Sequence, residues 1–160
     1  METEKINKAL FDKINFVKRY KELVKRHPCR PEIDLLTMLD FDLTKEILDS
    51  FGYKVRYYKS ENFFRVLDKR DGYDFGFNIA LEQGQAELIW DVSYNKVLVR
   101  DVTGIWMGLY ETLTGVAWED VPRYPRYGDY DELEDVLRGS FEIWEDFKKE
   151  FLKEAKNVGN

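Results

Sequence analysis

The chain has 160 residues, of which 44% are hydrophobic and 16% aromatic, and its formal net charge is −6. This composition argues against a disordered chain. The single cysteine, Cys29, excludes an intramolecular disulfide, and no stretch predicts a signal peptide or a membrane span. We therefore expect one cytoplasmic domain over residues 1–160, with a core that needs no disulfide.

Residues 3–26 form the first predicted helix. Apolar side chains recur along it at helical spacing, while most lysines and arginines lie on the opposite side. The apolar stripe comprises Ile6, Leu10, Ile14, Val17 and Val24. Thr3 is the expected N-cap, and Pro28 ends the helix because the residue before a proline resists helical backbone angles. The pattern predicts a helix that covers a sheet with its apolar stripe and exposes its basic side.

Two short helices are predicted after this first one. Pro31 suits the first turn of a helix over residues 31–39. Asp42 then has the character of an N-cap for a helix over residues 43–51, and Gly52 suits its C-terminal end.

His27 and Cys29 lie in the connector before these helices and belong to residue types that bind metals or act in catalysis. A zinc site needs about four ligands, and the chain has no other histidine or cysteine. No serine nucleophile motif, phosphate-binding loop or dinucleotide motif is recognisable. The sequence therefore predicts no catalytic, metal or cofactor site.

A period-two pattern dominates residues 53–102. Over residues 73–81 every second side chain is aromatic or aliphatic, so one face of the predicted strand is apolar. Similar runs lie on both sides and are separated by Ser, Asn, Asp and Gly, which favour tight hairpins. The pattern predicts an antiparallel meander of four strands, with a fifth strand over residues 96–102.

After the meander, the apolar period changes to about 3.6 residues, as in helices. The expected elements are a helix over residues 105–113 that ends at Gly115, an ordered loop over residues 116–128, and helices over residues 130–137 and 141–155. Gly139 and Ser140 are expected to separate the last two helices. The predicted fold class is α+β, with the meander packed by N-terminal and C-terminal helices.

The charge is unevenly distributed. Residues 111–135 contain eight acidic residues against Arg123 and Arg126, which gives this part of the chain a net charge of −6. Such a field repels nucleic-acid phosphates and attracts a basic protein partner. The first hairpin carries aromatic and basic side chains that suit base stacking, but the negative charge of the chain as a whole weighs against nucleic-acid binding. These side chains are Arg56, Tyr57, Tyr58 and Arg65.

An interaction surface is the functional feature that the sequence favours most. Tyrosine, tryptophan and arginine dominate binding hot spots, and all three occur beside the acidic cluster of residues 118–135. The expected partner-binding residues are Trp118, Glu119, Asp120, Tyr124, Tyr127, Asp129, Tyr130, Asp131 and Glu132. The alternative is that the aromatic residues fold under the loop and cover the core.

In its size, aromatic meander, terminal helices and acidic loop, the chain resembles the small acidic α+β immunity proteins of bacterial toxin systems, such as polymorphic toxins and contact-dependent inhibition. The resemblance implies a non-enzymatic protein that binds a cognate, basic toxin, for example a nuclease, in a stoichiometric complex. Two alternatives stay open: an adaptor or regulatory domain that uses the same loop, and an enzyme with a small-molecule pocket between the sheet and the helices.

Overall fold

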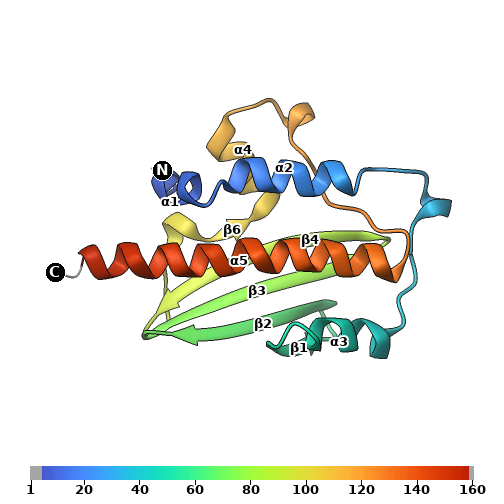
Figure 1. Cartoon of the computed structure of the whole chain (residues 1–160), viewed down its shortest axis with the longest axis horizontal. Coiled ribbons are helices and arrows are strands. Elements are labelled where there is room, and N and C mark those ends of the chain that lie inside the picture. The colour runs from blue at the N-terminus through green and yellow to red at the C-terminus, as the bar shows by residue number, and fades with distance from the viewer. Residues whose placement is uncertain (1–4, 159–160) are drawn as a thin grey trace.

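The computed structural model describes residues 5–158 and has an α+β fold, in which helices from both ends of the chain pack on an antiparallel sheet (Figure 1). The described strands are β1 Lys54–Tyr58, β2 Phe63–Arg70, β3 Tyr73–Glu82, β4 Gln85–Tyr94, β5 Val97–Leu98 and β6 Gly104–Ile105. The described α-helices are α1 Lys8–Lys13, α2 Phe16–Arg26, α3 Phe41–Asp49, α4 Trp106–Thr114 and α5 Tyr130–Val158. Over the same residues, no helix is long and apolar enough to cross a membrane.

The predicted meander is confirmed. Strands β1 to β5 follow one another across the sheet in chain order, and β6 pairs with β4. Residues at the hairpins adopt positive φ angles, as at Asn62 (53°) and Asp71 (52°). The fifth strand is shorter than predicted, because the chain turns into a 3-10 segment, η2 Arg100–Val102, of which Val102 is buried. There the Val102 carbonyl accepts a hydrogen bond of 2.8 Å from the Trp90 indole N–H.

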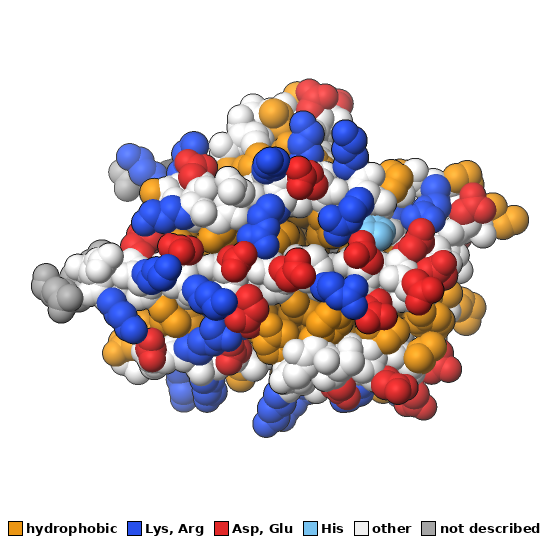
Figure 2. Space-filling model, in the orientation of Figure 1, with side chains coloured by type: hydrophobic (Ala, Val, Ile, Leu, Met, Phe, Trp, Pro, Cys, Tyr) orange, Lys and Arg blue, Asp and Glu red, His pale blue; other side chains and the backbone are white. Residues whose placement is uncertain are grey.

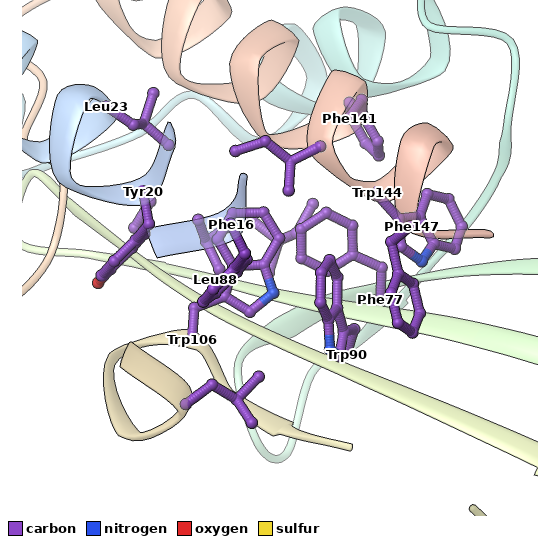
Figure 3. Close-up of a cluster of buried hydrophobic side chains, with 14 of the residues drawn as sticks. Phe16, Tyr20, Leu23, Phe77, Leu88, Trp90, Trp106, Phe141, Trp144 and Phe147 are labelled. Carbon is purple, nitrogen blue, oxygen red and sulfur yellow. The ribbon is translucent and has the colours of Figure 1, made fainter. Parts of the chain in front are cut away.

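The apolar face of the sheet forms one side of the core. Val66 pairs with Phe77, and Phe77 pairs with Trp90, so inward side chains line up across three strands. All three are fully buried. Figure 3 shows aromatic side chains from α2, α4 and α5 meeting this row. The Phe77 ring stacks on Trp106 with centroids 5.3 Å apart.

Helix α5 is continuous, so the predicted break at Gly139 and Ser140 is wrong. A Cβ atom at Gly139 would lie 3.1 Å from Cδ1 of Leu23, so glycine allows α2 to approach closely. The Ser140 hydroxyl donates to the Val136 carbonyl at 2.7 Å, which satisfies this buried group within the helix. Both residues therefore serve packing inside one long helix.

The first predicted helix is instead two helices. Asn15 takes a left-handed conformation with φ of 54° between α1 and α2, which asparagine tolerates better than most residues. The bend turns both Phe11 and Phe16 into the core, where each is at most 1% exposed. Asn7 caps α1 by accepting from the Leu10 N–H at 3.2 Å. The predicted cap Thr3 lies outside the described residues.

The helix predicted over residues 31–39 is also wrong. Only η1 Glu32–Asp34 is helical there, and the chain then continues without regular secondary structure to α3. Asp40, and not Asp42, caps α3: its Oδ1 accepts from the Leu43 N–H at 3.0 Å. Farther along, α4 is found as predicted and ends at Gly115, whose φ is 68°.

The buried face of β3 gives a direct test of this core. We expect Phe77→Ala to lower the free energy of unfolding by about 3–5 kcal/mol, the cost of deleting a buried aromatic ring. Asn78→Ala is the matched control on the opposite face, where a single hydrogen bond of 2.8 Å from Arg65 is lost. Its cost should be about 1 kcal/mol in denaturant unfolding. Equal losses at both positions would contradict the register of β3.

Candidate partner-binding surface

In the structure, the first and last parts of the predicted binding segment, residues 118–135, lie in different places. Its first part forms η3 Trp118–Asp120 beyond α4, and its last part begins α5. Figure 1 shows η3 above α4, whereas α5 begins at the right-hand end of the molecule. Trp118 is 45% exposed, with the Arg123 guanidinium 4.7 Å from its ring centre. Glu119 and Asp120 are also exposed.

The middle of this segment pairs with the start of β4, away from the part of the strand that β5 and β6 contact. The Ala86 N–H donates to the Pro125 carbonyl at 3.0 Å, and the Tyr127 N–H donates to the Gly84 carbonyl at 2.9 Å. This pairing turns Tyr127 into the core, where it is 0% exposed. The structure thus places Tyr127, one of the residues expected at the binding surface, among the core side chains.

Tyr124 is partly buried beside the same strand edge. Its hydroxyl donates to Glu87 at 3.1 Å, and burial, followed by the nearby Glu87 carboxylate, raises the pKa of Tyr124. This side chain is thus held against β4 rather than projected into solvent.

The N-terminus of α5 presents the other predicted residues. Asp129 accepts from the Glu132 N–H at 2.8 Å and caps the helix. The Gly128 N–H donates to the Glu132 carboxylate and is the main cause of its lowered pKa; Arg30 also donates, at 3.1 Å. Asp131 is exposed, and among the described residues no lysine or arginine pairs with it.

Residues 31–43 lie against this helix start and extend the surface. The Leu36 N–H donates to the Tyr127 carbonyl at 3.0 Å, and the Asp40 N–H donates to the Tyr130 hydroxyl at 2.8 Å. Gly128 is required at the crossing, because a Cβ atom there would lie 2.5 Å from the Asp34 carbonyl oxygen.

This contact brings two acidic stretches together. Residues 31–43 contain four acidic residues and residues 127–135 contain five, and neither stretch contains a lysine or arginine. Six of these side chains are exposed and, within residues 5–158, form no ion pair. We call this surface the acidic end and define it as Glu32, Asp34, Asp40, Asp42, Asp129 and Asp131. Figure 2 shows acidic and hydrophobic side chains gathered at the end of the molecule where α5 begins.

Large apolar side chains protrude from the acidic end. Ile33 is 92% exposed and Met38 is 85% exposed, far more than the half-exposed Phe41 beside them. Sequence reasoning missed this feature, because a short helix was predicted over residues 31–39 and none of its residues was assigned to an interaction surface. The sequence does carry a signal for this surface. Acidic and apolar residues alternate in residues 31–43, and no lysine or arginine lies among them.

The first hairpin, β1 and β2, is less suited to binding nucleic acid than its aromatic and basic residues indicate. Its open face is the side of the sheet away from the core, which carries Arg56, Tyr58 and Arg65. Tyr57 points to the core side, where its ring centre lies 4.9 Å from that of Phe64. Arg65 donates to both carboxylate oxygens of Asp91, at 2.8 and 3.0 Å. Its guanidinium charge is therefore already neutralised within the sheet.

His27 has a partner that the sequence did not reveal. Its Nε2 lies 2.6 Å from Oδ2 of Asp135, and the histidine is only 5% exposed. The hydrogen bond with His27 is the main cause of the lowered pKa of Asp135. Cys29 is exposed and accepts from Arg126 at 3.2 Å. The pair therefore connects α2 to α5, and Cys29 takes no part in it.

A second group of charged side chains joins β2 to α5. Lys148, which is fully buried, donates to Asp68 and to Glu145 at 2.7 Å each. Arg70 donates to the same two carboxylates, at 2.8 Å to Asp68 and 2.9 Å to Glu145. The ammonium group of Lys148 also lies 3.5 Å from the centre of the Trp144 ring. We call these four charged residues the charge clasp.

Of the charge clasp, Glu145 lines a neighbouring cavity of about 580 Å³ and is the member that an enzyme could use as an acid. Burial raises the pKa of Glu145, but hydrogen bonds from Lys148, Tyr53 and Arg70 outweigh burial and lower it to about 2. At neutral pH this carboxylate is ionised and its oxygens are occupied by donors. These properties favour a structural role over general acid catalysis.

Comparisons of the chain with protein-family models, with curated proteins and with solved structures find no match. The function is therefore inferred from the surface residues themselves.

The contact of His27 with Asp135 predicts unequal roles for the two connector residues. We expect His27→Leu to lower the free energy of unfolding by about 0.5–1.5 kcal/mol, because its hydrogen bond with Asp135 is lost while this half-exposed carboxylate keeps its ion pair with Arg26 at 3.3 Å. Cys29→Ser should leave stability unchanged, since the thiol is exposed. Denaturant unfolding of both variants measures this difference. Unchanged stability in His27→Leu would show that the pair contributes nothing to the fold.

The charge clasp predicts a specific loss of stability in acid. A carboxyl with a lower pKa in the folded state stabilises the fold above its unfolded pKa, and this contribution disappears as pH falls through the folded pKa. For Glu145 the window runs from its ordinary value of 4.5 down to about 2. Urea unfolding should show a steeper decline there for the wild type than for Glu145→Gln. Glu142→Gln, an exposed acid on the same helix, is the control, and equal slopes in wild type and Glu145→Gln would contradict the assignment.

Proposed function

We propose that this protein is a non-enzymatic inhibitor of the bacterial toxin-immunity type, which binds a basic protein partner through the acidic end. The observation that supports this proposal is the exposure of Ile33 and Met38, at 92% and 85%, among six carboxylates that form no ion pair with any described residue. Exposed apolar side chains within a charged rim are typical of protein–protein interfaces.

The two kinds of side chain have different effects on binding. Burying a side chain such as isoleucine or methionine stabilises a complex by about 1.5–3 kcal/mol. The surrounding carboxylates create a field that speeds the encounter with a basic protein and excludes acidic ones. Residues 31–43 thus supply affinity, while both acidic stretches supply selectivity.

Inhibition by such a surface requires no reaction. An enzyme that acts on nucleic acid needs lysine and arginine side chains to hold phosphates. A protein that covers those side chains with carboxylates occupies the substrate's place. Stoichiometric binding through the acidic end is therefore sufficient for an immunity function against a toxin of this class.

The test is affinity capture from the source organism with three baits. These are the wild type, the variant Ile33→Ser with Met38→Ser, and the control Trp118→Ser, which removes an exposed aromatic residue at the other end of the predicted segment. We expect the wild type and the control to capture the same basic protein. The double variant should lose about 2 kcal/mol or more of the binding free energy for it, measured by calorimetry.

The captured protein then distinguishes an immunity protein from an adaptor. Expressed alone it should stop growth, and co-expression of the wild type should restore growth. A partner that is harmless on its own would contradict the immunity function. Loss of the partner in Trp118→Ser, with binding kept in the double variant, would place the interface at η3 and not at the acidic end.

A further inference from the structure

A pocket of about 510 Å³ lies next to the acidic end, between α3 and the ends of strands β1 to β3. Three aromatic rings line it: Phe41 from α3, Tyr57 from β1 and Phe64 from β2. Asn62 and Glu82 lie at its polar side. We call this site the ring pocket and define it by these five residues.

The aromatic part of the ring pocket is fixed by mutual packing. The ring centres of Phe41 and Tyr57 lie 4.9 Å apart, as do those of Tyr57 and Phe64. Phe64 is only 5% exposed and forms the buried part, whereas Phe41 is 44% exposed. The rings are therefore held in place, and one of them remains available to a molecule from outside.

The polar part of the pocket orients one carboxylate. The Tyr57 hydroxyl donates to Oδ1 of Asn62 at 2.5 Å, and Nδ2 of Asn62 donates to Oε1 of Glu82 at 2.9 Å. No lysine or arginine lines the pocket, and no described residue forms an ion pair with Glu82. Glu82 is thus an exposed carboxylate with one oxygen held by Asn62 and, among the described residues, no ion-pair partner.

Aromatic rings beside this carboxylate suit an organic cation. The faces of aromatic rings carry negative charge density and attract guanidinium and ammonium groups. Among these, guanidinium is planar, stacks on rings and donates two parallel hydrogen bonds to a carboxylate. The ring pocket offers both contacts within one cavity.

We propose that the ring pocket binds an arginine side chain of the basic partner, with the guanidinium against Phe41 and hydrogen-bonded to Glu82. This inference rests on the proposed function, because it names the group that the partner presents. The pocket adjoins the acidic end in the chain, since Phe41 in its lining lies between Asp40 and Asp42. An arginine beside the contacts of Ile33 and Met38 would fix the orientation of the partner.

The test needs no partner and uses the full-length protein. Acetyl-arginine amide is titrated while the NMR signals of the aromatic rings and backbone amides are followed. Acetyl-citrulline amide, which has nearly the same shape but no charge, is the control probe. We expect saturable shifts at Phe41, Tyr57 and Glu82 with the arginine probe, and an affinity at least about tenfold lower with citrulline.

Variants assign the effect to the pocket. Glu82→Gln should weaken binding of the arginine probe about tenfold, because a charge-assisted hydrogen bond becomes a neutral one. Glu61→Gln, an exposed acid in the neighbouring β1–β2 turn, should bind like the wild type. Phe41→Leu keeps an apolar side chain but removes the ring, and should also weaken binding even if Glu82→Gln disturbs the fold.

Equal affinity for arginine and citrulline, or wild-type affinity in both Glu82→Gln and Phe41→Leu, would overturn the inference. Shifts spread over the acidic end without saturation at the pocket would overturn it as well. These outcomes leave the capture experiment unaffected, because that experiment depends on Ile33 and Met38. Failure of the pocket and failure of the proposed function can therefore be told apart.

Discussion

The structure depends on the packing around Trp90, where the sheet meets four helices. Its ring centre lies 4.1 Å from that of Phe147 in α5 and 4.9 Å from that of Trp106 in α4. Phe11 of α1 and Phe16 of α2 complete the contacts, at 6.0 and 5.5 Å. Its indole N–H is satisfied by the Val102 carbonyl, so a polar atom is buried there at little cost.

This core and the charge clasp together fix α5 across the sheet, and the position of α5 determines where the acidic end lies. Lys148 holds the middle of the helix to β2, while His27 holds its first turns to α2 through Asp135. The start of α5 is thereby placed beside residues 31–43. The acidic end is the result of this placement, since the two stretches are far apart in the sequence and meet only in the folded chain.

The sequence predicted the elements whose signal is local. Alternation over residues 73–81 and in the neighbouring runs, with turn residues between them, was sufficient for the meander, and Gly115 for the end of α4. The helix break predicted at Gly139 is wrong, because in a sequence a glycine that allows two helices to pack closely looks the same as a glycine that ends a helix. Asp129 and Asp131 were assigned to the binding surface from charge alone. Ile33 and Met38 were not, because their exposure depends on the contact between residues 31–43 and Tyr127, which no local pattern encodes.

The most direct measurement of the central claim is hydrogen exchange of the protein, free and in complex with its partner. Binding through the acidic end predicts slower exchange of backbone amides in residues 31–43 and at the start of α5, with little change on the open face of β1 and β2. Protection confined to that open face, around Arg56 and Tyr58, would contradict the account and place the partner on the sheet.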